Sequence, residues 1–191
     1  IADTIEDEGA VAAEEKVRRF DAMLAAFTGP AQAGAFCEST ASITGDPAHV
    51  ELVRHASDVF TLWRDLPAAS GAHVQRWVGE MVRGMRKIVL AYPRGIRLRT
   101  LAEYHEYCYY VAGTVGYMLT DLWREHSPAI DAGADTALVE RARAFGEALQ
   151  TVNILKDVAV DAVRENAIYV PEELLRSHGS SHATIIDPAY E

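Results

Sequence analysis

The sequence predicts an all-α fold, and three observations support this prediction. Apolar residues recur at helical spacing along most of the chain, whereas the alternating pattern of β-strands is scarce. Hydrophobic residues make up 49% of the 191 residues, enough for a substantial core. Gly-Pro, Asp-Pro and Pro-Arg-Gly stretches separate the helical segments. We therefore expect one α-helical domain over residues 1–191, packed as a bundle.

The first part of the chain predicts three helices joined by turns. Residues 2–27 are good helix formers with apolar side chains at helical spacing, and Gly29-Pro30 ends this segment. A short helix around 31–42 follows, and the turn Thr-Gly-Asp-Pro at 44–47 leads to a helix over about 49–65. The side chains expected to face inward from this third helix are Val53, Val59, Phe60 and Trp63.

The middle of the chain predicts two longer helices. A turn at 67–71 precedes a helix over about 72–90, and a loop follows at 92–97. Thr100 begins the stretch Thr-Leu-Ala-Glu, which matches the capping box that often starts a helix. We expect this helix to continue through Leu122.

The last part predicts one long helix and one short one. A loop at 127–135 precedes a helix over about 136–163, and Pro171 opens a short helical piece. The tail from Ser180 is expected to be irregular.

Charge and composition narrow the class of protein. The chain carries 28 acidic and 18 basic residues, a formal charge of −10, which argues against a nucleic-acid partner because phosphate binding needs a basic surface. Cys37 and Cys108 are too few for a disulfide framework and are expected to be reduced thiols. No signal peptide and no apolar run of about 20 residues is visible. We expect a cytoplasmic protein, and the start without methionine indicates a fragment.

Two aspartate pairs are the first candidates for a functional site. Residues four apart project from the same face of a helix, so Asp3 lies with Asp7, and Asp157 with Asp161. Like charges at this spacing destabilise a helix by about 0.2–0.5 kcal/mol per pair, and they raise each other's pKa unless a cation intervenes. For either pair alone, a solvated helix face is the commoner explanation.

The second pair belongs to a polar stripe on an otherwise apolar helix. Gln150 and Asn153 precede Asp157 and Asp161 at helical spacing. Carboxylates are rarely buried without a partner, and oxygen ligands without nearby histidine or cysteine suit Mg²⁺. We therefore expect two acidic helix faces that bind a diphosphate through shared Mg²⁺ ions. The apolar neighbours that predict burial of this helix are Leu149, Val152, Ile154, Leu155, Val158, Ala159 and Val160.

A third stretch, at 106–119, presents Tyr107, Val111, Val115 and Leu119 in one row with four-residue spacing. Glycine inside a helix costs about 1 kcal/mol relative to alanine, so the glycines beside this row indicate close helix packing or room for a ligand. Such a row is more often part of a core than of a binding site.

Four stretches together closely resemble, in the same order, the squalene/phytoene synthase family. They read DTIED at 3–7, YCYYVAGTVGYML at 107–119, LQTVNILKD at 149–157 and YVPEEL at 169–174. The resemblance covers essentially the whole chain. It implies an all-α isoprenoid-synthase fold around a central apolar cavity, with further helices before and after this chain.

The same resemblance implies an activity. Family members join two prenyl diphosphates head to head, of the farnesyl or geranylgeranyl type, through a cyclopropyl diphosphate. Mg²⁺ would be the cofactor, and the product would be a C30 or C40 compound such as squalene, dehydrosqualene or phytoene. NADPH would be needed only if the product is squalene.

The resemblance also assigns residues. Asp3 and Asp7 match the first aspartate motif, and Asn153, Asp157 and Asp161 match the second, so these five are the expected metal ligands. Tyr107 matches a tyrosine with a catalytic role, which it would share with Asp3, Asp7 and Asp157. The positions expected to bind substrate are Gln150, Val111, Val115, Leu119, Lys156 and Arg164.

Three departures from the family pattern stand out. The second motif usually carries a glutamate just before its last aspartate, and here that position is Val160. The arginine usually found before Asp157 is Lys156, which keeps the charge but loses bidentate phosphate contacts. The Gly-Arg that usually precedes Tyr-x-Pro is replaced by Asn166-Ala167, and the spacing allows a one-residue length difference.

Other functions stay open at this point. A family member that kept the fold and lost catalysis would serve as a binding or assembly factor; Val160 and Asn166-Ala167 favour this alternative, whereas the retained aspartates and Tyr107 oppose it. A terpene cyclase is less favoured because of the 107–116 helix. Prenyl diphosphates are the expected ligands, peripheral contact with a membrane is a further possibility, and the oligomeric state does not follow from the sequence.

Overall fold

The computed structural model describes residues 1–186, apart from the side chain of Ala132. Within this range every regular element is a helix and no β-strand is present, which confirms the all-α prediction. An isolated backbone bridge joins Arg97 to Ile168 and ties the loop before residue 100 to the segment after residue 165.

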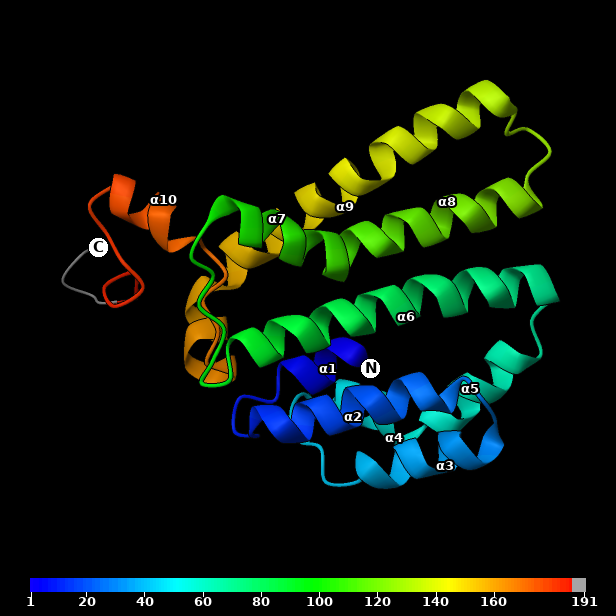
Figure 1. Cartoon of the computed structure of the whole chain (residues 1–191), viewed down its shortest axis with the longest axis horizontal. Coiled ribbons are helices and arrows are strands. Elements are labelled where there is room, and N and C mark those ends of the chain that lie inside the picture. The colour runs from blue at the N-terminus through cyan, green and yellow to red at the C-terminus, as the bar shows by residue number, and fades with distance from the viewer. Residues whose placement is uncertain (187–191) are drawn as a thin grey trace.

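A long helix, α6 (Ala68–Ala91), crosses the middle of the molecule (Figure 1). Shorter helices lie on one side of it: α1 (Ala2–Glu6), α2 (Ala13–Ala26), α3 (Pro30–Ser39), α4 (Pro47–Arg54) and α5 (Ala56–Arg64). On the other side are α7 (Leu101–Cys108), the π-helical turn η1 (Tyr109–Gly113), α8 (Thr114–His126) and α9 (Ala132–Val160). The π-helical turn η2 (Asp161–Glu165) continues α9 and lies against Gly9, just after α1. The short α10 (Glu172–Ser177) lies at one end of the molecule.

Two apolar cores correspond to this arrangement. The first packs α1 to α5 against α6, with Phe20, Phe36 and Met85 almost fully buried. The second gathers Leu98, Tyr107 and residues 167–170 around the end of α6. Because α6 contributes to both cores, it holds the α1 side of the molecule against the α9 side.

The first predicted helix is wrong in one respect, because residues 2–27 form two helices rather than one. The break spans residues 7–12, where Glu8 is buried and pairs with Arg19. Glu8 also accepts hydrogen bonds from the backbone N–H of Thr44 (2.9 Å) and from its hydroxyl (3.0 Å). These contacts turn the chain after α1 and fasten it to α2 and to the loop before α4.

The predicted helix over 49–65 is also divided, at His55, into α4 and α5. Asp46 caps α4 by accepting the backbone N–H groups of Ala48 and His49. Phe60 is buried as predicted, but Val59 is 37% exposed. The break at His55 rotates α5 relative to a continuous helix, so the inward face differs from the one that unbroken periodicity predicts.

The capping box at Thr100 is confirmed. The Thr100 hydroxyl accepts the backbone N–H of Glu103, and the Glu103 carboxylate accepts the N–H of Thr100. The helical stretch that follows runs from α7 through η1 into α8 and ends at His126. A π-helical turn has a wider repeat than an α-helix, so η1 shifts the register between Tyr107 and the later members of its predicted row.

The predicted burial of α9 is wrong. Ile154 is buried, but Leu149, Val152 and Leu155 are 52%, 63% and 64% exposed, and Ala159 and Val160 are also exposed. The cause is packing on one side only: α9 contacts α7, η1 and α8, and within residues 1–186 no helix covers its opposite side. Apolar composition all round a helix therefore does not ensure burial.

The end of the chain is only partly described. The predicted short helix after Pro171 is α10, and residues 182–186 form turns, as expected for an irregular tail. The rest of that predicted tail, 187–191, lies outside the described residues. Cys37 and Cys108 are free thiols. Among the described helices, none has both the length and the apolar character needed to cross a membrane.

Candidate functional site

The two acidic helix faces line one cavity of about 240 Å³, which we call the acidic cavity. It lies between α1 and the final turns of α9, with α7 contributing one wall. The structure thus brings together residues about 150 positions apart in the sequence. The predicted residues that line it are Asp3, Asp7, Tyr107, Gln150, Asn153, Lys156, Asp157 and Asp161.

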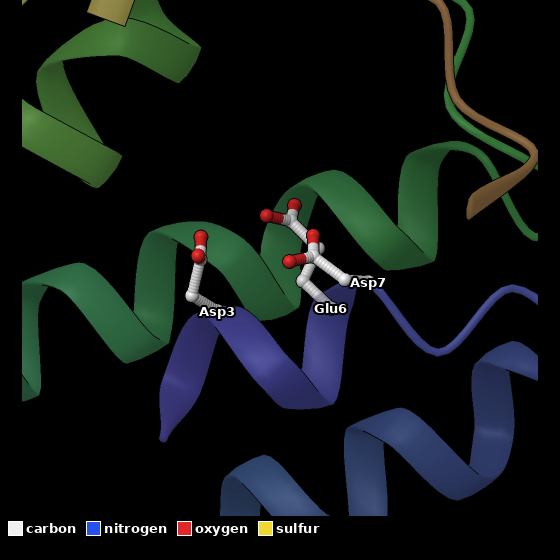
Figure 2. Close-up of side chains that lie close together, drawn as sticks. All are labelled: Asp3, Glu6 and Asp7. Atoms are coloured by element: carbon white, nitrogen blue, oxygen red, sulfur yellow. The ribbon is translucent and has the colours of Figure 1, made fainter. Parts of the chain in front are cut away.

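On the α1 side, three carboxylates point the same way (Figure 2). Oxygen atoms of Asp3, Glu6 and Asp7 all lie within 4.8 Å of one another. Glu6 is only 2% exposed, and its Oε1 has no hydrogen-bond partner. Burial, followed by the charge of Asp3, raises the pKa of Glu6 to about 8. A buried carboxylate oxygen without a hydrogen-bond partner, beside two more carboxylates, is suited to bind a cation.

The sequence interpretation missed Glu6. Its signal was present, because Glu6 is three residues from Asp3 and therefore shares its helix face. The position directly before Asp7 suggested a different face, since neighbouring helical residues point about 100° apart. In this short helix the three side chains nevertheless converge.

The α9 side contributes a second row of carboxyl groups. Burial and the charge of Asp157 raise the pKa of Asp161 to about 6. Across the cavity, burial and Asp3 raise the pKa of Asp7 to about 9, with smaller contributions from Glu165, Glu6 and Asp161. The two helix faces are therefore close enough to repel each other, and a shared cation would remove that repulsion.

Tyr107 lies between the two rows. It is 2% exposed, and its hydroxyl donates a hydrogen bond to Oε2 of Glu6 over 3.3 Å. Its ring stacks on Tyr169, with centroids 4.5 Å apart. Burial, followed by the charge of Glu6, raises the pKa of Tyr107 well above its ordinary value. The phenol is therefore neutral and held in place by both its ring and its hydroxyl group.

Two basic residues lie near the carboxylates in different environments. Lys156 is largely exposed at the cavity, and its ammonium pairs with Asp157 over 3.2 Å. Lys16 is buried and donates to the backbone carbonyl oxygen of Glu6, and burial lowers its pKa. The carboxylates in this part of the structure outnumber these two lysines, so the site carries more negative than positive groups.

Four predicted substrate-binding residues do not line the acidic cavity. Val111 packs against the two cores, and Val115 is half-buried. Leu119 lines a separate apolar groove of about 280 Å³ with Trp123 and other residues of α8 and α9. Arg164 lines a different cavity, of about 550 Å³, which we call the outer cavity. The hollow between the acidic faces is thus mainly polar, not apolar as expected.

Glu165 is the second residue that the sequence interpretation missed. It is half-buried at the end of η2 and lines the acidic cavity with both aspartate pairs. Burial and the charge of Asp161 raise its pKa to about 7. The signal was its position four residues after Asp161, which continues the spacing of Asp157 and Asp161.

The donor set suits a hard divalent cation. Its candidate ligands are carboxylate oxygens with the amide oxygen of Asn153, and no histidine or cysteine lines the cavity. Mg²⁺ prefers such oxygen ligands, keeps several waters and bridges carboxylates to substrate phosphates. The unpartnered Oε1 of Glu6, on a carboxylate next to those of Asp3 and Asp7, independently suits a cation ligand.

Comparison with known proteins identifies a family that the whole chain resembles. The family model described as squalene/phytoene synthase matches residues 1–191. Phytoene synthase 3, chloroplastic, of Zea mays is 41% identical over 108 residues, which are 56% of this chain and 24% of that protein. Phytoene synthase of Thermus thermophilus is 43% identical over 84 residues, 44% of this chain and 26% of that protein.

Solved structures agree with the sequence comparison. The structure of TcSQS with ligand BPH1237 is 25% identical, with a TM-score of 0.74, and covers 99% of this chain and 52% of that chain. The chain thus spans about half of that structure, and its matches span about a quarter of each curated relative. A family model that matches the whole sequence, together with these relatives, shows that the chain belongs to the squalene/phytoene synthase family.

Proposed function

We propose that the protein containing this chain catalyses the Mg²⁺-dependent head-to-head condensation of two prenyl diphosphates, farnesyl or geranylgeranyl diphosphate. The observation that carries the proposal is the acidic cavity, in which aspartates of α1 and α9 face one space beside Tyr107. Membership of the squalene/phytoene synthase family supports the same reaction class.

The carboxylates would hold Mg²⁺ and, through it, bind and orient the substrate diphosphates. Bound Mg²⁺ supplies the positive charge that neutralises a leaving diphosphate. Asp3 and Asp7 would hold it from one side, and Asn153, Asp157 and Asp161 from the other. Lys156 adds a flexible cation at the edge of the cavity, and Gln150 adds an amide that can bond to phosphate oxygens.

Tyr107 is the proposed proton relay. The condensation passes through a cyclopropyl diphosphate, and forming it requires loss of a proton from carbon. A neutral phenol can accept a proton on its oxygen only as it passes its own proton on, and Glu6 accepts that hydrogen bond over 3.3 Å. In this step Tyr107 would take the proton from carbon on its hydroxyl oxygen as its own proton passes to Glu6, which accepts it only when ionised; bound Mg²⁺ would favour that ionised form.

Apolar surface beside the cavity supports the prenyl part of the proposal. Val111, Val115 and Leu119 are the proposed contacts of the hydrocarbon chains, and the apolar groove at Leu119 extends along α8 and α9. We also propose peripheral contact with a membrane, which the exposed apolar side of α9 supports. The product would be squalene, dehydrosqualene or phytoene, with NADPH required only for squalene.

The test is direct. The full-length protein is incubated with farnesyl or geranylgeranyl diphosphate and Mg²⁺, and the extract is analysed for a C30 or C40 product. We expect coupling with one substrate and none when EDTA replaces Mg²⁺. Absence of coupling with both substrates, in a protein shown to be folded, would reject the enzymatic function.

A binding or assembly factor is the second candidate. Val160, where the family usually has glutamate, and Asn166-Ala167 favour it. Thermal stabilisation by a non-hydrolysable prenyl diphosphate analogue separates the two functions. A working site gives a rise in Tm that requires Mg²⁺, whereas a vestigial site gives no Mg²⁺-dependent rise.

A further inference from the structure

The position where the family's second motif usually has a glutamate is occupied by Val160, which cannot bind a cation. Val160 is 43% exposed and lines the outer cavity together with Asp7, Arg164 and Glu165. A carboxylate at this position would therefore face the same cavity as Asp7. The chain lacks it, while the rest of the aspartate row is retained.

Glu165 brings a carboxylate to the same region by a different route. Asp157, Asp161 and Glu165 follow each other at four-residue spacing, so they form one row along the end of α9 and η2. Glu165 lines both the acidic cavity and the outer cavity, and Asp7 lines the same two cavities from the α1 side. It therefore reaches the α1 side of the site from the α9 side.

The π-helical turn explains how the chain accommodates this residue. In η2 the backbone N–H of Asn166 bonds to the carbonyl oxygen of Asp161, five residues back, instead of four as in an α-helix. Such a turn holds one more residue than an α-helical turn. It thus matches the one-residue length difference from the family that the sequence allows just before Tyr169.

Contacts on both sides fix the backbone at Glu165. Asn166 adopts a left-handed conformation with φ of 55°, which stops the helix directly after Glu165. Its side-chain amide donates to the carbonyl oxygen of Arg94, and Arg97 donates to its Oδ1 over 2.8 Å. On the other face, Gly9 lies directly against the backbone of Arg164 and Glu165. These contacts hold the backbone of Glu165 in one position.

We propose that Glu165 is an additional ligand of the Mg²⁺ site and supplies the carboxylate that the family usually carries at the position of Val160. This inference rests on the proposed function. Its independent support is Glu6, whose Oε1 is buried and unpartnered, and whose carboxylate forms a cluster with those of Asp3 and Asp7 in which one oxygen of each lies within 4.8 Å of the others. The cluster to which Glu165 adds its charge thus contains a buried carboxylate oxygen that no hydrogen bond satisfies.

The test measures metal binding without turnover. Mn²⁺ is titrated into the full-length protein in the presence of inorganic diphosphate, and free Mn²⁺ is followed by electron paramagnetic resonance. Glu165→Gln should weaken Mn²⁺ binding by about tenfold or more, since loss of a group that supports a metal typically costs 10–100-fold in affinity. Glu140→Gln, an exposed neutralisation on the same helix, is the matched control and should change nothing.

A double variant sharpens the result. Adding Val160→Glu to Glu165→Gln restores a carboxylate at the family's usual position and should recover most of the lost affinity. The inference is overturned if Glu165→Gln binds Mn²⁺ as well as the unaltered protein does, or if Glu140→Gln loses as much affinity. If Val160→Glu does not recover affinity, a carboxylate at position 160 cannot replace the one at position 165. If the unaltered protein binds no Mn²⁺, both the proposed function and this inference fail. If the unaltered protein and Glu165→Gln bind Mn²⁺ equally, only this inference fails.

Discussion

Gly9 and Arg164 touch through their backbones, and this contact joins the two halves of the acidic cavity. A Cβ built on Gly9 would lie 2.3 Å from the carbonyl oxygen of Arg164 and 2.9 Å from the Cα of Glu165. Both distances are far below van der Waals contact. Only glycine lets the turn after α1 approach the end of α9 so closely.

Gly9→Ala should therefore separate the two acidic faces. We expect a lower Tm and weaker Mg²⁺ binding, because the segments that carry Asp7 and Glu165 must move apart. The control is Gly34→Ala in α3, where a Cβ would meet no atom within 4 Å. That substitution should be neutral or stabilise the protein by about 0.4–1 kcal/mol. Equal behaviour of the two variants in thermal unfolding and Mg²⁺ titration would contradict the prediction.

Asparagine in place of one aspartate on either face should reduce turnover. Asp3→Asn and Asp157→Asn each remove a charge that we propose holds Mg²⁺, and we expect a loss of about 100-fold or more in kcat/KM. Product formation from radiolabelled prenyl diphosphate at saturating Mg²⁺ measures the effect. Glu38→Gln, an exposed change on α3, should keep full activity. Near-normal turnover in both aspartate variants would show that the reaction does not use these faces.

The stability of the metal-free protein should fall as the pH rises from about 5 to 9. The folded-state pKa values of Asp161, Glu165, Glu6 and Asp7 are raised to about 6, 7, 8 and 9. Groups with raised pKa values favour the folded state while they are protonated, and this stabilisation is lost as each ionises. Mg²⁺ should reverse the trend, because it favours the ionised carboxylates. Thermal unfolding across this pH range in EDTA and in Mg²⁺ measures both effects; a flat Tm in EDTA would contradict the prediction.

Tyr107→Phe isolates the hydroxyl group that bonds to Glu6. The ring can still stack on Tyr169, so the fold should persist, while kcat should fall about 100-fold or more if the hydroxyl relays a proton. Tyr104→Phe on the same helix is the control, since its hydroxyl bonds to Thr151 away from the cavity. We expect little change in kcat for the control. A similar kcat in Tyr107→Phe and the unaltered protein would exclude the relay.

Local sequence rules predicted the parts of the fold that depend on local contacts. The start of α7 followed from Thr100 and Glu103, whose reciprocal hydrogen bonds lie within one turn. The pairing of Asp157 with Asp161 followed from helical spacing. The divisions after α1 and at His55 did not follow, because helix-forming residues continue through both, and the contacts of Glu8 with Arg19 and Thr44 are distant in sequence.

The sequence predicted the two aspartate faces of the site, but it did not predict the contributions of Glu6 and Glu165. The motif spacing predicted that the aspartates of both faces share one site. The same helical spacing groups Glu6 with Asp3 and Glu165 with Asp161, but only the folded structure shows that these carboxylates reach the site. Glu165 depends on a π-helical turn, which the sequence marks only as a length difference from relatives. The burial of α9 was overestimated because burial depends on what packs against a helix, whereas composition describes the helix alone.

The exposed side of α9 has a consequence for handling the protein. Phe145 is 64% exposed, and Val152 and Val163 are 63% and 75% exposed, so hydrocarbon faces water along several helical turns. Contiguous apolar surface of this kind drives association in solution. Residues 1–191 expressed alone should therefore be colloidally unstable, bind the dye 8-anilinonaphthalene-1-sulfonate and elute in size-exclusion chromatography as aggregates that mild detergent disperses.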